Sequence, residues 1–175
     1  MRIAIIGTTG SGKSTLAANL AVELHIPHTE LDNLHWLPGW QERTDTEFRE
    51  LVDVATRQTA WVIDGGYSVV RDLVWGRADL IVWLHYSFAT TAWQLIRRTI
   101  RRNKQRVPCC NGNYESVRRS LGHDSILLWL LKSYAKNRRA FPRALKQYPG
   151  AQQVVLRSPV ETSRWLEAVS STPES

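Results

Sequence analysis

The segment GTTGSGKST, residues 7–15, has the residue types and the spacing that bind phosphate groups. Gly7, Gly12, Lys13 and Ser14 complete the pattern G-x-x-x-x-G-K-[ST], and the segment lies between an apolar run and a helical-looking stretch. Successive backbone N–H groups in such a loop form a concave anion site, which the positive end of the following helix strengthens. We therefore expect the loop to bind a nucleoside triphosphate. The alternative is a glycine-rich turn without function.

Two side chains of this loop have separate expected roles. The ammonium group of Lys13 can reach the β- and γ-phosphates, and the hydroxyl of Ser14 can ligate Mg²⁺. ATP and Mg²⁺ are the expected cofactors, because neither N-K-x-D nor T-K-x-D, the signatures of guanine binding, occurs in the chain. The predicted nucleotide-binding residues are Gly7, Thr8, Thr9, Gly10, Ser11, Gly12, Lys13, Ser14 and Thr15.

A basic segment, RRTIRRNKQR at 97–106, contains no acidic residue and contributes to the net charge of +7. So many basic residues in one segment suit either the phosphate backbone of a nucleic acid or the phosphates of a bound nucleotide. The third interpretation is a helix face in contact with solvent. Residues four apart share a helix face, so Arg98 pairs with Arg102 and Arg97 with Arg101. The irregular stretch that follows, with Pro and Gly, predicts a mobile helical lid over approximately 103–122.

Strands and helices must alternate to position these residues. Apolar runs predict strands, and amphipathic stretches predict helices between them, which indicates an α/β fold with right-handed crossovers. We expect a three-layer P-loop NTPase fold with a five-stranded parallel sheet and helices on both faces. The predicted strands are 2–6, 28–32, 60–66, 78–86 and 151–157; the predicted helices are 13–24, 44–59, 88–103, 115–147 with a break near Gly122, and 158–169; residues 33–40 are a predicted loop.

Acidic residues and glycines follow two of these strands, where ligands bind in parallel α/β sheets. A carboxylate beside a phosphate loop can hold Mg²⁺ through water or accept a proton from an attacking hydroxyl. The residues concerned are Glu30, Asp32, Asp64, Gly65 and Gly66. Trp36 and Trp40 flank Pro38-Gly39, and they form either the wall of an aromatic pocket or part of the core.

The order of motifs along nearly the whole chain resembles small kinases related to adenylate kinase and shikimate kinase. The closest likeness is to the bacterial group often labelled topology modulation protein. This resemblance implies transfer of the γ-phosphate of ATP to a small-molecule acceptor, either a nucleotide or a hydroxyl metabolite. The motifs are GTTGSGKST, ELDNLHWLPGW, WVIDGGY, ADLIVWL, RRTIRR, YAKNRRAFPRAL and VVLRSP.

The resemblance also implies roles for single residues. Glu30-x-Asp32 matches an acid pair of such kinases, so Asp32 is expected to orient or deprotonate the acceptor, and Glu30 is the second acid of the pair. Lys13, Asp32 and three arginines form the expected catalytic set. The arginines are Arg98 and Arg102, by an R-x-x-x-R likeness, and Arg138, which resembles the arginine that bridges both substrates. The expected acceptor-binding residues are Asp32, Trp36, Gly65, Gly66, Tyr67 and Arg71.

The chain departs from this pattern at the end of the fourth strand, where relatives often carry Leu-Asp. Here the residues are Leu84-His85-Tyr86. A neutral imidazole cannot replace a carboxylate that assists Mg²⁺, so His85 stays outside the predicted catalytic set.

Length and composition limit the remaining possibilities. The 175 residues suit one domain, 1–175, and no apolar run is long enough to cross a membrane, so a cytoplasmic protein is expected. Cys109 and Cys110 are adjacent and read as ordinary thiols, with a zinc site that includes His123 and Asp124 as the alternative. Two other functions stay open: a nucleotide-dependent nucleic-acid binding protein and a regulatory NTPase switch. The sequence leaves the oligomeric state undetermined.

Overall fold

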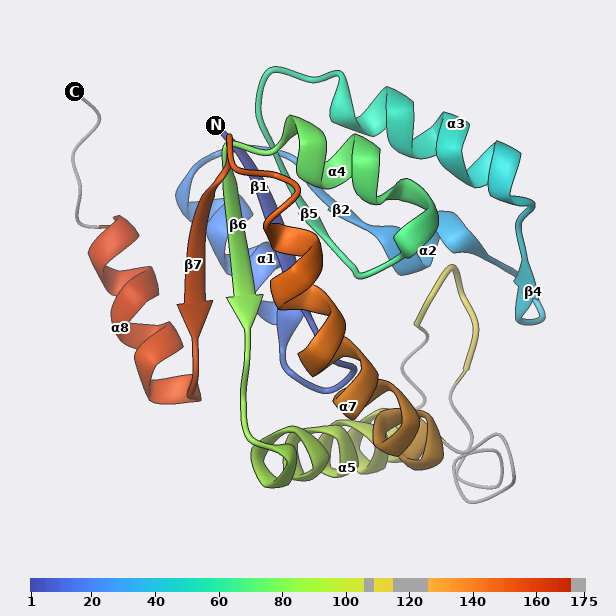
Figure 1. Cartoon of the computed structure of the whole chain (residues 1–175). Coiled ribbons are helices and arrows are strands. Elements are labelled where there is room, and N and C mark those ends of the chain that lie inside the picture. The colour runs from blue at the N-terminus through green and yellow to red at the C-terminus, as the bar shows by residue number, and fades with distance from the viewer. Residues whose placement is uncertain (106–108, 115–125, 171–175) are drawn as a thin grey trace.

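The computed structural model describes residues 1–105, 109–114 and 126–170. Its centre is a parallel five-stranded sheet in the order β2-β5-β1-β6-β7 (Figure 1). The strands are β1 (Arg2–Gly7), β2 (His28–Glu30), β5 (Trp61–Asp64), β6 (Leu80–Leu84) and β7 (Gln152–Leu156). A separate antiparallel pair joins β3 (Trp36–Leu37) to β4 (Gln41–Glu42).

Helices cover both faces of the sheet, as the alternation of elements predicted. Along β1, Ala4 and Ile6 face one core cluster, and Ile3 and Ile5 face the other, because successive strand residues point to opposite faces. The described helices are α1 (Lys13–Glu23), α2 (Leu31–His35), α3 (Asp45–Thr56), the 3₁₀ turn η1 (Ser68–Val70), α4 (Arg71–Arg77), α5 (Phe88–Gln105), α7 (Ile126–Leu145) and α8 (Pro159–Ser170).

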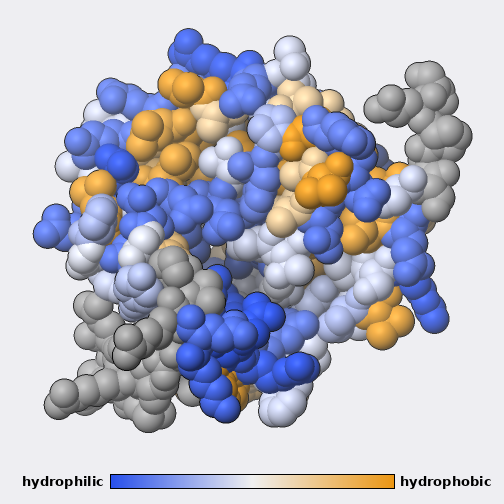
Figure 2. All heavy atoms as spheres, turned by 180° about the vertical axis from the view of Figure 1, so that it is seen from behind, coloured by the Kyte–Doolittle hydropathy of each residue, from blue (hydrophilic) through white to orange (hydrophobic). Residues whose placement is uncertain are grey.

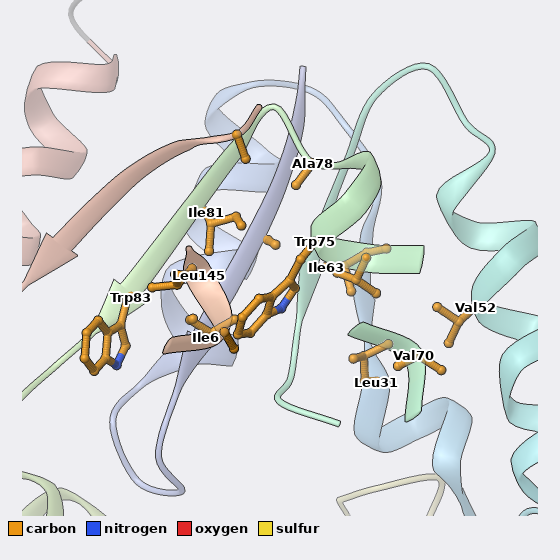
Figure 3. Packing of buried hydrophobic residues seen from close by; sticks show 14 of the residues in the cluster. Ile6, Leu31, Val52, Ile63, Val70, Trp75, Ala78, Ile81, Trp83 and Leu145 are labelled. Atoms are coloured by element: carbon orange, nitrogen blue, oxygen red, sulfur yellow. The ribbon is translucent and has the colours of Figure 1, made fainter. Parts of the chain in front are cut away.

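The larger core cluster lies between the sheet and the helices α3, α4 and α7. Figure 3 shows Ile6, Ile63 and Ile81 pointing from three neighbouring strands toward Trp75 of α4 and Leu145 of α7. The second cluster joins the opposite face of the sheet to α1 and to the inner side of α8. The fold class is therefore confirmed as a three-layer α/β fold.

Helix α5 lies beyond the carboxyl ends of the strands and not on a face of the sheet (Figure 1). It begins at Phe88, shortly after β6 ends, and runs across this edge. Its buried residues Thr91 and Leu95 pack toward the interior, and its arginines come later along the same helix. The helix therefore brings cations to the edge of the sheet where the phosphate loop begins.

The strand predicted over 28–32 ends earlier, at Glu30, and a short helix replaces part of the predicted loop over 33–40. In α2, Leu31 and His35 are four residues apart, and both are buried. Residues four apart lie on one face of a helix, so the helical turn buries both side chains on the same side. Asp32 is consequently a helix residue.

The other predicted elements are present, and their described ends differ from the predicted ones by at most three residues, whereas β3, β4, η1 and α4 were not predicted. Thr44, one of two predicted caps, closes a capping box with Glu47 at the start of α3. Helix α5 continues two residues past the predicted 103, to Gln105. Of the predicted 115–147 helix, residues 115–125 lie outside the described residues, as do 106–108 and 115–122 of the predicted lid. Among the helices described, none has both the length and the apolar character to span a membrane.

Candidate functional site

The loop at residues 7–15 connects β1 to α1 at the carboxyl edge of the sheet. Gly10 and Gly12 have φ angles of +84° and +88°, which side-chain-bearing residues rarely adopt. A Cβ atom on Gly10 would lie 2.8 Å from Cβ of Leu95 on α5. Gly12 is the N-cap of α1 and carries no side chain to bond the first amides of the helix. These amides and the helix dipole suit an anion.

Lys13 folds back over the loop, and its Nζ donates to the backbone oxygen of Thr8 at 3.1 Å. Burial lowers the pKa of Lys13, while the nearby carboxylates of Asp64 and Asp32 act in the opposite direction. The ammonium group therefore lies between the loop and two acids. Thr8 itself is buried, so it contributes its carbonyl oxygen and not an exposed hydroxyl.

Asp64 is the acid closest to the loop, and it is only 4% exposed. It ends β5, the strand next to β1, and it pairs in register with Ile5 and with Glu30 of β2. Ser14 Oγ donates to Asp64 Oδ2 at 2.8 Å. Nε2 of His28 lies 2.7 Å from the other carboxylate oxygen, Oδ1. Asp64 thus bridges a loop hydroxyl and an imidazole.

This arrangement fits Mg²⁺, which takes one or two carboxylates plus phosphate oxygens and keeps several waters. Sequence reasoning included Asp64 among the acids near strand ends but left it out of the site. The available signal was an acid that directly ends a short apolar strand, Val62-Ile63-Asp64. The proximity of Ser14 and His28 came only from the folded chain.

Glu30 and Asp32 are two further acids near Asp64. Burial raises the pKa of Glu30, and the neighbouring charge of Asp64 raises it further, while His28 and Arg102 act the other way. Arg102 reaches this site from α5, and the charge of Arg98 on the same helix acts on Lys13. Cations of α5 therefore face the acids of β2, α2 and β5.

Lys13, Glu30, Asp32 and the arginines of α5 line one large cleft of about 2150 Å³, whereas Asp64 and His28 are not part of its lining. The loop forms one wall, and Asp32, Trp36, Gly65, Gly66 and Tyr67 line another part of it. Hydrophilic residues gather at the lower centre of the molecule, at the end where α5 lies (Figure 2). The basic residues on the cleft are Arg97, Arg98, Arg101, Arg102, Lys104, Lys132 and Lys136, besides Lys13.

Asp32 is held in place by a phenol. Tyr67 Oη donates to Asp32 Oδ1 at 2.7 Å, and burial together with the charge of Asp32 raises the pKa of Tyr67 well above its usual value. The phenol therefore stays protonated and keeps donating. Beside it, the rings of Trp36 and Trp40 meet edge to face at 5.5 Å, and both side chains line the cleft.

Three residues singled out from the sequence lie elsewhere. The guanidinium of Arg71 lies over the ring of Trp75 at 4.7 Å, away from the cleft lining. Arg138 Nη1 donates to Tyr134 Oη at 2.9 Å and does not line the cleft, although its neighbour Asn137 does. Their roles with substrate stay predictions. His85 stacks on Trp83 with ring centroids 4.2 Å apart.

Burial lowers the pKa of His85, and the charges of Arg138 and Arg157 lower it further. The exclusion of His85 from the catalytic set stays a prediction. The alternative zinc site includes His123 and Asp124, which lie outside the described residues. Within the described ranges, His, Cys, Asp and Glu side chains form no group of three or more around a common metal position.

Comparison with known proteins identifies the fold. No protein-family model matches the chain. An uncharacterized protein, YqaC of Bacillus subtilis (strain 168), is 29% identical over 115 residues, and the match spans 65% of this chain and 65% of that relative.

Similar solved structures include three kinases. A gluconokinase from Sinorhizobium meliloti 1021 is 18% identical, with 96% of this chain and 94% of that chain covered and a TM-score of 0.54. A shikimate kinase from Bacteroides thetaiotaomicron is 17% identical, with 97% and 95% covered and a TM-score of 0.57. An unliganded sugar kinase from Janibacter sp. HTCC2649 is 17% identical, with 96% and 91% covered and a TM-score of 0.52. The chain therefore has the fold of small P-loop kinases.

Proposed function

We propose that this protein transfers the γ-phosphate of ATP, with Mg²⁺, to a hydroxyl group of a small-molecule acceptor. The observation that carries the proposal is one cleft that contains the phosphate loop with Lys13 and Ser14, the carboxylate of Asp32, and the arginines of α5. Phosphoryl transfer requires positioning of two substrates and positive charge around the moving group, and little else.

In the nucleotide half of the site, the amides of residues 7–15 hold the phosphates and Lys13 neutralises their outer oxygens. Ser14 and Asp64 would hold Mg²⁺, and the ion would supply positive charge beside the phosphates. The 2.7 Å contact with His28 fixes the carboxylate so that its other oxygen faces Ser14. His28 is thus a positioning residue for the metal site.

In the acceptor half, Asp32 receives or orients the proton of the attacking hydroxyl. Tyr67 donates to one oxygen of Asp32 and directs the other toward the cleft. Gly65 and Gly66 allow the acceptor to approach the backbone, and Trp36 forms an aromatic wall. Gluconokinase, shikimate kinase and sugar kinase share this fold, which supports a small hydroxylated acceptor.

Arg98 and Arg102 stabilise the phosphoryl group in this proposal, because both line the cleft from α5. Arg138 and Arg71 reach the substrates only after a change of side-chain direction. We also propose that residues 1–175 form one domain with a lid over approximately 103–122. Membership of the adenylate kinase-related group labelled topology modulation protein belongs to this proposal, and the ELDNLHWLPGW and WVIDGGY motifs support it.

The test is transfer of labelled phosphate from ATP to a panel of hydroxyl metabolites and nucleotides. Lys13→Ala is expected to weaken Mg-ATP binding in calorimetry, and Asp32→Asn to bind Mg-ATP normally but to lose transfer. Glu50→Gln, on an exposed acid of α3, is the matched control. ATP hydrolysis without transfer to any acceptor, at a rate that Asp32→Asn leaves unchanged, contradicts the proposal.

An exposed stripe of α5, part of which also lines the cleft, supports one alternative, a nucleotide-dependent nucleic-acid binding protein. Trp93 is 61% exposed, and Arg97 and Arg101 lie on the same exposed side of the helix. Cationic and aromatic side chains together suit a phosphate backbone with stacked bases. This alternative predicts retention of DNA or RNA in a gel shift at about 50 mM salt that is lost as salt rises. Absence of any retention at that salt excludes it.

A further inference from the structure

Residues 109–113, Cys-Cys-Asn-Gly-Asn, form a tight turn at the edge of the cleft. Cys109 N donates to the backbone oxygen of Asn113 at 2.7 Å and closes the turn. Cys110, Asn111 and Gly112 have φ angles of +42°, +60° and +80°, so the chain reverses through three consecutive left-handed residues. The two cysteines thus lie at a bend and not along an extended strand.

Two asparagines fix this turn onto the segment that carries Trp36 and Trp40. Asn111 Nδ2 donates to the Trp36 oxygen at 3.1 Å, and its backbone N donates to Asn33 Oδ1 at 3.0 Å. Asn113 Nδ2 donates to the Leu37 oxygen at 2.9 Å, and its Oδ1 accepts from Trp40 N at 3.0 Å. The bonds hold the backbone of both cysteines in one place.

The two thiols lie at consecutive positions of this turn. Cys109 and Cys110 are both reduced and half-buried, both line the cleft, and Cys109 is close enough to raise the pKa of Cys110. Asp32 and Arg102 are close enough to act electrostatically on Cys110, and Cys110 acts in the same way on Tyr67. The pair therefore lies beside Asp32, on the side of the cleft away from the nucleotide loop.

We propose that Cys109 and Cys110 form a dithiol site for a thiophilic trivalent metalloid, such as an organoarsenic(III) oxide, at the acceptor side of the cleft. The term acceptor side depends on the function proposed above, whereas binding of arsenic by the two thiols does not depend on that function. Soft thiol ligands select soft metal and metalloid centres. The second sulfur binds within the same molecule, so its effective concentration is high and the chelate is retained.

The step balances without an oxidant or a reductant. Two As–S bonds form and the arsenic–oxygen bond breaks, while the two thiol protons leave with that oxygen as one water molecule. Arsenic stays in the +3 state. Cys109 and burial raise the pKa of Cys110, so this thiol is protonated in the free protein and loses its proton as the As–S bond forms. Neighbouring cysteines also reach disulfide geometry poorly.

Phenylarsine oxide is the probe, and intact-mass spectrometry of the folded protein is the readout. We expect one phenylarsenic group per chain, retained against excess glutathione and removed by 2,3-dimercaptopropanol. Cys109→Ser and Cys110→Ser each leave one thiol, so retention is expected to fall about a hundredfold or more. A single-serine variant that keeps the adduct as well as the parent overturns the proposal. The proposal is also overturned if the folded parent forms no adduct while the urea-unfolded chain forms one.

Calorimetry with Mg-ATP on the adduct separates this inference from the proposed function. The pair lies away from residues 7–15, so ATP affinity is expected to stay within about twofold of that of the free protein. Loss of ATP binding upon capture overturns the placement at the acceptor side. Parent protein that never binds ATP contradicts the proposed function and leaves the dithiol capture as its own result.

Discussion

Asp64→Asn separates the electrostatic role of this carboxylate from its role in the fold. The amide has the same shape, accepts from Ser14 through its oxygen and can donate to His28 through its nitrogen, so both contacts of Asp64 have a replacement. We expect the free energy of unfolding without Mg²⁺ to change by about 1 kcal/mol or less, since each hydrogen bond contributes about that much.

The loss of charge acts on the metal. An ion bound to Ser14 Oγ at about 2.1 Å lies within about 5 Å of Asp64 Oδ2, because the two protein oxygens are 2.8 Å apart. Coulomb's law for a divalent ion and one carboxylate then gives about 1.7 kcal/mol in bulk water and about 6.6 kcal/mol at an effective dielectric of 20. The lower value corresponds to at least about tenfold weaker Mg²⁺ binding.

The assay is a Mg²⁺ titration of ATP binding at constant ATP, followed by calorimetry, with parent and variant side by side. Asp45→Asn, an exposed acid in the first turn of α3, is the matched control and should titrate like the parent. Equal Mg²⁺ dependence of Asp64→Asn and the parent would refute the assignment of Asp64 to the metal. A variant that is unfolded before Mg²⁺ is added would refute the claim that its contacts are replaceable.

Four further predictions concern stability and positioning. Burial and Asp64 raise the pKa of Glu30 above its unfolded value, so ionisation of Glu30 costs stability at neutral pH. Glu30→Gln should therefore raise Tm at pH 7. In thermal scans across pH, this gain should disappear below the unfolded pKa of about 4.3. Gly10→Ala should destabilise by about 1–3 kcal/mol in urea unfolding, because its Cβ would strike α5 at a positive φ; unchanged stability contradicts that packing. His28→Gln should raise the Mg²⁺ concentration that ATP binding requires, while the affinity for metal-free ATP stays constant. An equal loss of affinity with and without Mg²⁺ would indicate a structural role only. Thr44→Ala should cost about 1 kcal/mol as a lost helix cap, measured by chemical denaturation, with Thr46→Ala as the neutral control.

The conformation of the loop at residues 7–15 and the fold class could be predicted because their signals are local, whereas phosphate binding by the loop stays a prediction. Gly12, Lys13 and Ser14 occur in one short segment whose backbone geometry depends on its own glycines and on the helix that follows. Alternating apolar runs and amphipathic stretches indicate a parallel sheet covered on both faces, since each element must bury its apolar side. Neither inference requires knowledge of which distant residues meet.

The side of the cleft that carries Asp32 could be predicted only in part. Asp32, Trp36 and Tyr67 line the cleft, and their contacts with an acceptor stay predictions. The turn of the chain into α2 was missed, because a three-residue strand leaves too short a pattern to show where it ends. Arg98 and Arg102 face the cleft, whereas Arg138 donates to Tyr134. The direction of a helix side chain depends on how the whole helix is rotated against the sheet, and spacing alone does not fix that rotation.

The sequence by itself determined the phosphate loop, the parallel sheet and the cationic helix, because each follows from residues that are neighbours along the chain. The tertiary structure alone decided that Ser14, His28 and Asp64 meet, and that the Cys109–Asn113 turn docks beside Trp36. Those contacts join segments separated by up to 78 residues. They depend on strand order and register, which the packing of the complete core selects.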